Sequence, residues 1–143
     1  MRRTHNARQC FPGRRRPAHL ARLRLVANDI LAEAVRPEVV AMVRMVIATA
    51  PQFPHLAQLV DQIGWEKGVQ SVKKILLDGV VQSTEQTQKA EAAARRFIAA
   101  TFGPHQLRAL LGDSSDVLTV QASLLIENAI STLSIAGELP NND

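Results

Sequence analysis

Cysteine and tyrosine are almost missing from this 143-residue chain, which has Cys10 as its single cysteine and no tyrosine. One cysteine excludes an intramolecular disulfide framework and a zinc site built from several cysteines. It fits a reducing, cytoplasmic location. Aromatic residues are limited to one Trp and four Phe. The length suits one domain, whose core is therefore expected to consist of Ala, Leu, Val and Ile.

Long apolar runs are also missing. None reaches the roughly 18 residues that a membrane-spanning helix requires. Near the N-terminus, arginines interrupt the apolar stretches in which the core of a signal peptide would lie. We therefore expect no membrane partner.

The motifs of common enzyme and metal sites are absent. There is no Gly-rich phosphate loop, G-x-S-x-G or H-E-x-x-H sequence. Ser114 and Ser115 lie between two aspartates, and a helix cap accounts for them. The four histidines show no i,i+4 pairing; they are His5, His19, His55 and His105. We predict no enzyme, no catalytic residue, no metal and no cofactor.

Acidic residues are missing from residues 1–24, which carry eight arginines. The other nine Lys and Arg residues face 13 acids, so the rest of the chain has a net charge of −4. Residues 1–17 lack apolar periodicity and are predicted to be a basic, disordered arm. A solvated tail, or upstream sequence included by a mis-set start codon, is the favoured interpretation. Phosphate contact by Arg14–Arg16 is the alternative.

Helical periodicity is what the chain has in abundance, with no strand pattern. It predicts an all-α, antiparallel bundle of about five to six helices over residues 18–137, followed by a flexible tail at 138–143. The third helix can bend at Gly64 and Gly68. The expected helices are His19–Val35, Pro37–Ala50, Pro54 to about 79–82, Glu85–Phe102, a short His105–Leu111, and about 116–136. Gly103-Pro104 is expected to end the fourth.

Residues 36–59, RPEVVAMVRMVIATAPQFPHLAQL, predict a buried helix, a two-proline corner and the start of another helix. The pattern over Val43–Ala48, followed by Phe53–Leu56, resembles the C-terminal domain of AefR-like regulators in the tetracycline-repressor (TetR) family. His55 and Thr49 depart from acidic residues common in that pattern. The resemblance covers about residues 20–137 and implies a ligand-binding and dimerisation domain of a transcriptional regulator.

The resemblance implies a pocket for a small apolar or amphipathic effector, formed by the helices before the dimerising pair. Apolar walls suit such a pocket, although each of these residues alone could equally be core. The candidate lining is Met42, Met45, Val46, Phe53, Leu59, Ile63, Trp65, Phe97 and Thr101. Arg44, within an apolar helix, is expected to pair with Glu33 or Asp61 rather than with a ligand.

The last helix has two wide apolar faces, which are hard to bury in a small monomer, and an alanine-rich helix precedes it. We therefore favour a homodimer over a monomer in which both faces are internal core. TetR-family regulators dimerise through these last two helices. The candidate interface is Ala90, Ala93, Ala94, Val117, Val120, Leu124, Leu125, Ile130 and Leu133.

A complete TetR-family regulator begins with a helix-turn-helix of about 45–50 residues that enters the DNA major groove. The residues before the first expected helix show no such pattern, so DNA binding is expected only through a helix-turn-helix that this chain lacks. The first hypothesis is an effector-binding and dimerisation domain truncated of its DNA reader. The alternative is a non-DNA-binding helical protein that heterodimerises with a full-length relative. A third is salt-sensitive nucleic-acid contact by the arginine arm.

Overall fold

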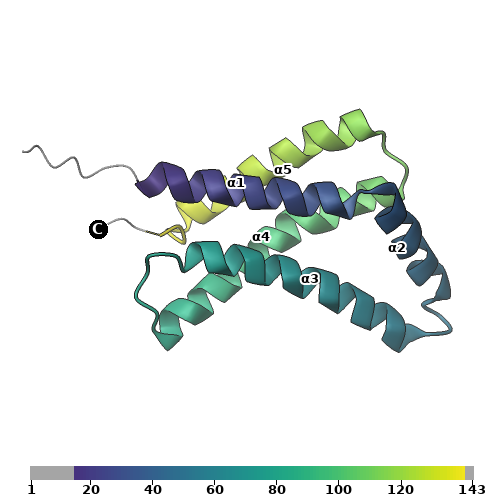
Figure 1. Ribbon diagram of the computed structural model, residues 1–143, viewed down its shortest axis with the longest axis horizontal. Coiled ribbons are helices and arrows are strands. Elements are labelled where there is room, and N and C mark those ends of the chain that lie inside the picture. The colour runs from purple at the N-terminus through teal and green to yellow at the C-terminus, as the bar shows by residue number, and fades with distance from the viewer. Residues whose placement is uncertain (1–14, 141–143) are drawn as a thin grey trace, which may run out of the picture.

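The computed structural model describes residues 15–140, with side chains from residue 18 onward. Five helices account for most of this range (Figure 1). They are α1 (Arg15–Ala34), α2 (Pro37–Thr49), α3 (Pro54–Leu76), α4 (Thr84–Leu110) and α5 (Ser115–Ile135). Residues 15–140 contain no strand. The predicted all-α fold is confirmed.

Proline and serine set where the helices begin. Pro37 and Pro54 occupy the first turns of α2 and α3, where an amide donor has no intrahelical acceptor. The Ser83 hydroxyl accepts the backbone N–H of Gln86 at 3.1 Å and caps α4, and Ser114 caps α5 in the same way. The predicted helix starts at Pro37 and Pro54 and the predicted cap at Ser114 are confirmed.

The fourth helix is longer than predicted. α4 continues through Gly103 and Pro104, so the expectation that it ends there and that a separate short helix follows was wrong. Pro104 removes the amide that would bond the Ala100 carbonyl. Gly103 has no Cβ to collide with the proline ring, and His105 and Ala109 are buried after it. The packing of His105 and Ala109 against the rest of the protein stabilises the part of α4 that follows Pro104.

Both ends of the domain differ from the predicted boundaries. α1 begins at Arg15, earlier than expected, and residues 1–14 of the predicted arm lie outside the described residues. In the predicted C-terminal tail, Glu138 pairs with Arg96 and Leu139 packs against the core. Residues 141–143 of that tail lie outside the described residues.

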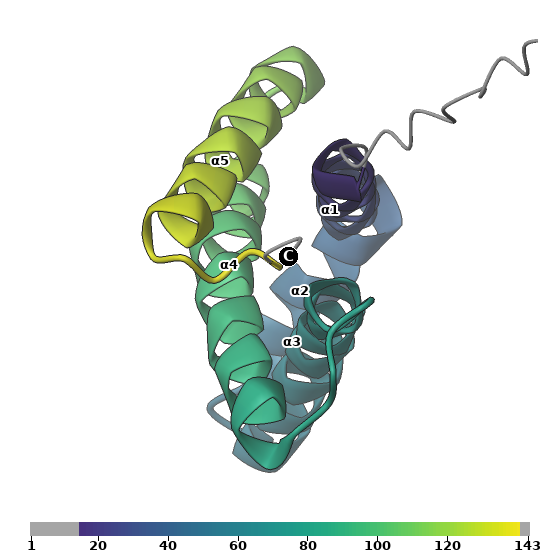
Figure 2. The ribbon, with the colours of Figure 1, turned by 90° about the vertical axis from the view of Figure 1, so that its left-hand side faces the viewer.

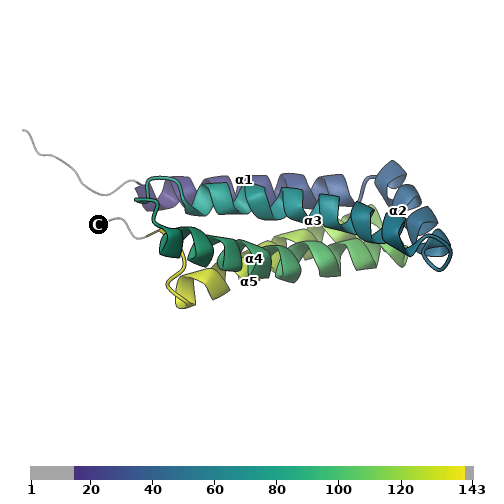
Figure 3. The same cartoon turned by 90° about the horizontal axis from the view of Figure 1, so that it is seen from below.

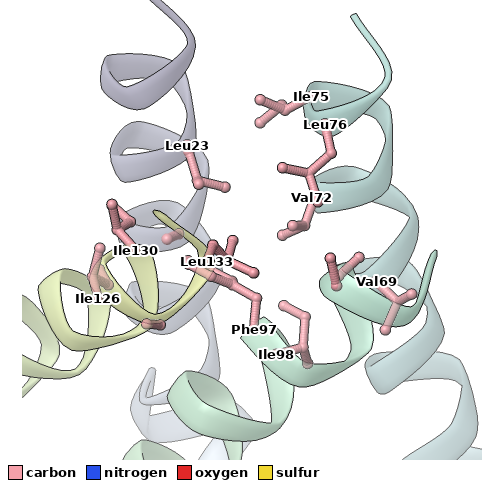
Figure 4. Close-up of a cluster of buried hydrophobic side chains, with 14 of the residues drawn as sticks. Leu23, Val69, Val72, Ile75, Leu76, Phe97, Ile98, Ile126, Ile130 and Leu133 are labelled. Atoms are coloured by element: carbon pink, nitrogen blue, oxygen red, sulfur yellow. The ribbon is translucent and has the colours of Figure 1, made fainter. Parts of the chain in front are cut away.

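The helices form two layers. α1 and α3 lie in one layer, α4 and α5 in the other, and α2 crosses one end (Figures 2 and 3). Side chains from α1, α3, α4 and α5 meet between the layers (Figure 4). The labelled members of this core are Leu23, Val69, Val72, Ile75, Leu76, Phe97, Ile98, Ile126, Ile130 and Leu133. α2 adds one buried side chain, Val40, in a small separate cluster.

Candidate ligand-binding cavity

A cavity of about 670 Å³ lies between α1, α2, α3 and α4, at the end of the bundle that α2 crosses. This volume is in the range of small-molecule sites. α5 contributes none of the lining. The lining residues are Asp29, Ile30, Glu33, Ala34, Val39, Met42, Val43, Val46, Ile47, Ala50, Ala57, Val60, Asp61, Gly64, Lys67, Gly68, Ser71, Phe102, Gln106 and Leu110.

Small residues on one face of α3 create this space. A Cβ built at Gly64 would meet no heavy atom within 4 Å, whereas one at Gly68 would lie 3.1 Å from Cδ1 of Ile98. At Gly68, therefore, α3 packs closely on α4, and one turn earlier the space opens. Ala57 continues the same small-residue face toward the beginning of α3. The backbone of α3 thus forms part of the cavity wall.

Charged groups lie among a mainly apolar lining. The lining residues include the acids Asp29, Glu33 and Asp61 and the base Lys67, all of which are also exposed to solvent. Arg36 holds Glu33, because its Nη1 lies 3.1 and 3.2 Å from the two carboxylate oxygens. A few polar groups in an apolar wall are typical of sites that orient a small molecule.

An aromatic pair supports the α4 side of the cavity. Phe102 lines the cavity, and the Trp65 ring meets it edge to face, with centroids 6.4 Å apart and planes at 87°. Trp65 is partly buried against the core behind Phe102 and does not line the cavity. A change in Phe102 is therefore transmitted to the single Trp of the chain.

The nine residues expected to form a pocket are divided among three environments. Two line the cavity, namely Met42 and Val46. Four are exposed on α2, α3 and the corner between them, namely Met45, Phe53, Leu59 and Ile63. The other three pack elsewhere, Phe97 and Thr101 in the core and Trp65 behind Phe102. These seven do not line the cavity; on the first half of α3, the apolar residues Leu59 and Ile63 face solvent instead.

Sequence reasoning missed most of the wall, including all of the α1 contribution. On α3 most lining residues are small or polar, and Val60 is the exception; the full set is Ala57, Val60, Asp61, Gly64, Lys67, Gly68 and Ser71. The predicted lining consists mainly of large apolar side chains, which fill space rather than leave it. The sequence signal that could have indicated this wall is the series of small residues at helical spacing on α3.

Arg44 does not have the expected acidic partner. Its guanidinium donates to the backbone carbonyl of Leu110, with Nη2 at 2.9 Å, and to that of Ala109 at 3.4 Å. Both carbonyls belong to the last turn of α4, where helical amides run out; the Ala109 carbonyl also accepts the backbone N–H of Gly112 at 3.1 Å. Arg44 thus fastens α2 to the end of α4, beside the cavity.

The residues expected at a dimer interface also lie in different environments. Five are buried in the core of their own chain, so they have no surface to offer a partner: Ala90, Ala93, Ala94, Ile130 and Leu133. Leu125 is partly buried. Three remain exposed on α5, namely Val117, Val120 and Leu124. Leu107 and Leu111, across the turn that joins α4 to α5, are also exposed. We call these five exposed residues the hairpin surface.

His105 is a polar residue buried next to the cavity wall, between Pro104 and Gln106. It is 2% exposed, and no hydrogen-bond partner is found for its Nδ1. Burial lowers the pKa of His105, while a hydrogen bond to the backbone of Leu31 opposes that shift. The neutral imidazole is therefore the form that fits this site.

Two further features bear on function. Between residues 15 and 140, no group of three His, Cys, Asp or Glu side chains could hold a metal ion. Within that same part of the chain, α5 alone has the length and composition of a membrane span, with 21 residues and a mean hydropathy of 1.2. One face of α5 is buried in the protein core, as in the core helices of soluble proteins, so the composition is weak evidence for a membrane.

Comparison with known families agrees with this architecture. Residues 21–136 match the family described as AefR-like transcriptional repressor, C-terminal domain. The match includes all of α2, α3, α4 and α5 and most of α1. No curated protein and no solved structure matches the chain.

Proposed function

The chain belongs to the AefR-like family of C-terminal domains of transcriptional repressors, and we propose from this premise that it senses a small apolar or amphipathic effector and pairs with a second copy. The sequence resemblance to this family is confirmed. The family is regulatory rather than enzymatic. The matched residues 21–136 include α2, α3, α4, α5 and most of α1, and no DNA-reading role is proposed for these helices.

The effector proposal rests on the cavity between α1, α2, α3 and α4. It has the volume and the apolar lining of a small-molecule site. α2, which forms one wall, has only Val40 buried and is otherwise fastened by Arg44. A helix with so little burial can move at low cost and admit a ligand.

The hairpin surface is proposed as the dimer interface. Leu107, Leu111, Val117, Val120 and Leu124 are each more than half exposed and flank one turn of the chain. An exposed apolar group of this kind is expected to be covered by a partner. A two-fold axis would place the same five residues on both sides of the interface.

α4 connects the two proposed sites. Phe102, Gln106 and Leu110 face the cavity, while Leu107 and Leu111 on the same turns face solvent. A ligand that displaces the cavity face of this helix therefore also displaces the proposed interface. In a cytoplasmic regulator, such a movement would change the spacing of the attached DNA readers.

Ligand binding is tested by titrating the protein with decanol and following Trp65 fluorescence and the melting temperature. Decanol at 100 times its Kd should raise the stability by about 2.7 kcal/mol and alter the fluorescence through Phe102. The absence of both changes for decanol, decylammonium and decanoate would overturn the effector proposal.

Dimerisation is tested by light scattering of the protein and of Leu124→Glu. The wild-type chain should be a dimer at micromolar concentration, and Leu124→Glu should be a folded monomer, because each interface would acquire two buried charges. Val81→Glu is the matched control: Val81 is 89% exposed and lies away from the hairpin surface. A wild-type monomer, or a dimer unaffected by Leu124→Glu, would contradict the proposed interface.

A further inference from the structure

Most acidic side chains that the structure describes form ion pairs, and two of the three exceptions line the cavity. The structure describes twelve acidic side chains, and nine of them lie within 4.0 Å of a basic group. The other three are Asp29, Asp61 and Asp116, for which no basic partner is found among the described residues. Asp116 lies in the first turn of α5, where the helix dipole stabilises a negative charge. Asp29 and Asp61 both line the cavity.

The positions of Asp29 and Asp61 in their helices explain why they have no partner. Asp29 has no Lys or Arg three or four residues away on α1, and Asp61 has none on α3, so neither gains an intrahelical pair. Glu33 lies four residues after Asp29 and could share a basic partner with it, but Glu33 already binds Arg36. Two acidic residues with no ion pair among the described residues thus line a mainly apolar cavity, one from α1 and one from α3.

Besides its acidic residues, the lining has one positively charged residue. Lys67 is the only basic residue that lines the cavity, and it forms no ion pair within the described residues. With Glu33 neutralised by Arg36, one positive side chain against two negative ones leaves the lining with a net negative charge. Phe102, an aromatic residue of the kind that attracts cations, is also part of the lining.

We propose that the cavity selects amphipathic cations, namely molecules with an apolar body and one protonated amine. The apolar body occupies the space beside Gly64 and Met42, and Asp29 and Asp61 attract the amine. This inference rests on the proposed effector function and adds the charge of the effector to it. A matched anion is disfavoured by the same two carboxylates.

The test compares three probes that share one alkyl chain, each below its aggregation concentration: decylammonium, decanol and decanoate. Amines of this kind are protonated at pH 7, like the side chain of lysine. We expect decylammonium to bind at least five-fold more tightly than decanol, and decanoate to bind more weakly than decanol. Trp65 fluorescence and calorimetry give the dissociation constants.

Three variants assign the preference to named groups. Asp29→Asn and Asp61→Asn should each weaken decylammonium binding by about five-fold, the upper range for a solvent-accessible ion pair, and leave decanol unchanged. Lys67→Gln should strengthen decylammonium binding and weaken decanoate binding further. Glu85→Gln is the control, because Glu85 also carries one negative charge but lies in the first turn of α4, at the opposite end of that helix from the cavity.

The outcomes separate this inference from the proposal on which it rests. Binding of decanol with no preference for decylammonium, or with a preference for decanoate, would overturn the charge selection and leave the effector cavity intact. An equal effect of Glu85→Gln and Asp61→Asn would also overturn it, because the preference would then come from overall charge. If none of the three probes binds, the effector function itself fails.

Discussion

Filling the cavity from the backbone of α3 should stabilise the domain and block its ligand in a single step. Gly64 lies within α3, and a Cβ at this position meets nothing within 4 Å. Replacing a helical glycine with leucine removes a propensity cost of about 0.8 kcal/mol. Partial burial of the new side chain against Met42 and Val46 of the facing wall adds to this gain. We therefore expect Gly64→Leu to raise the free energy of unfolding by about 1 kcal/mol.

The same side chain should exclude part of any ligand. If leucine takes the space of three methylene groups, a bound alkyl chain loses about 2.4 kcal/mol at ~0.8 kcal/mol per group, or roughly 50-fold in Kd. Scanning calorimetry of the free protein should show a rise in Tm of about 3 °C. Titration with decanol should show the weaker binding.

The matched control is Gln62→Leu, which adds the same side chain to the same helix at an exposed position outside the lining. It should leave the Kd for decanol unchanged. A Gly64→Leu protein that binds decanol as tightly as the wild type would refute the assignment of Gly64 to the binding wall. A fall in its stability would show that the space beside Gly64 is already filled.

Three further predictions concern the surroundings of the cavity. Gly68→Ala should gain little or lose stability, because its Cβ would lie 3.1 Å from Ile98 Cδ1; Ile98→Val removes that atom, so urea unfolding of the double variant should show less loss than the sum of the two single variants. Arg44→Ala should speed amide hydrogen exchange throughout α2, since the bonds to the Leu110 carbonyl are lost; unchanged exchange would contradict the fastening role. His105 has a lowered pKa, so the unfolded chain takes up a proton near pH 6.5 before the folded one does. The free energy of unfolding should therefore fall as the pH drops below about 6.5, and a His105→Leu variant with the same pH slope would argue against this assignment.

The helices could be predicted from sequence because their signals are local. Pro37, Pro54 and Ser83 each mark a helix start through the backbone groups next to them, and apolar spacing marks most of the buried faces. Pro104 misled the prediction, because the cost of a proline in a helix was offset by the burial of His105 and Ala109, which lie beyond it in the chain.

The cavity could be predicted only in part. All nine candidates came from the family resemblance; Met42 and Val46 line the cavity, whereas Leu59 and Ile63 are exposed. Whether an apolar stripe faces a cavity, the core or water depends on the rotation of its helix, which local spacing does not fix. Asp29 was missed for a related reason. An exposed acid indicates a binding role only when no basic residue lies near it in the folded chain, and local spacing does not show this.

The two halves of α3 contribute to different parts of the structure, and this affects how the sequence of such a domain can change in evolution. The second half of this helix supplies Val69, Val72, Ile75 and Leu76 to the core, while the wall beside Gly64 is nearly bare backbone. A single-nucleotide change from glycine to a larger residue would reshape the wall without removing any core atom. Lineages that descend from a chain of this kind can therefore acquire different chemical preferences while they keep the same bundle, and the threshold of stability that limits most mutations is not an obstacle at this wall.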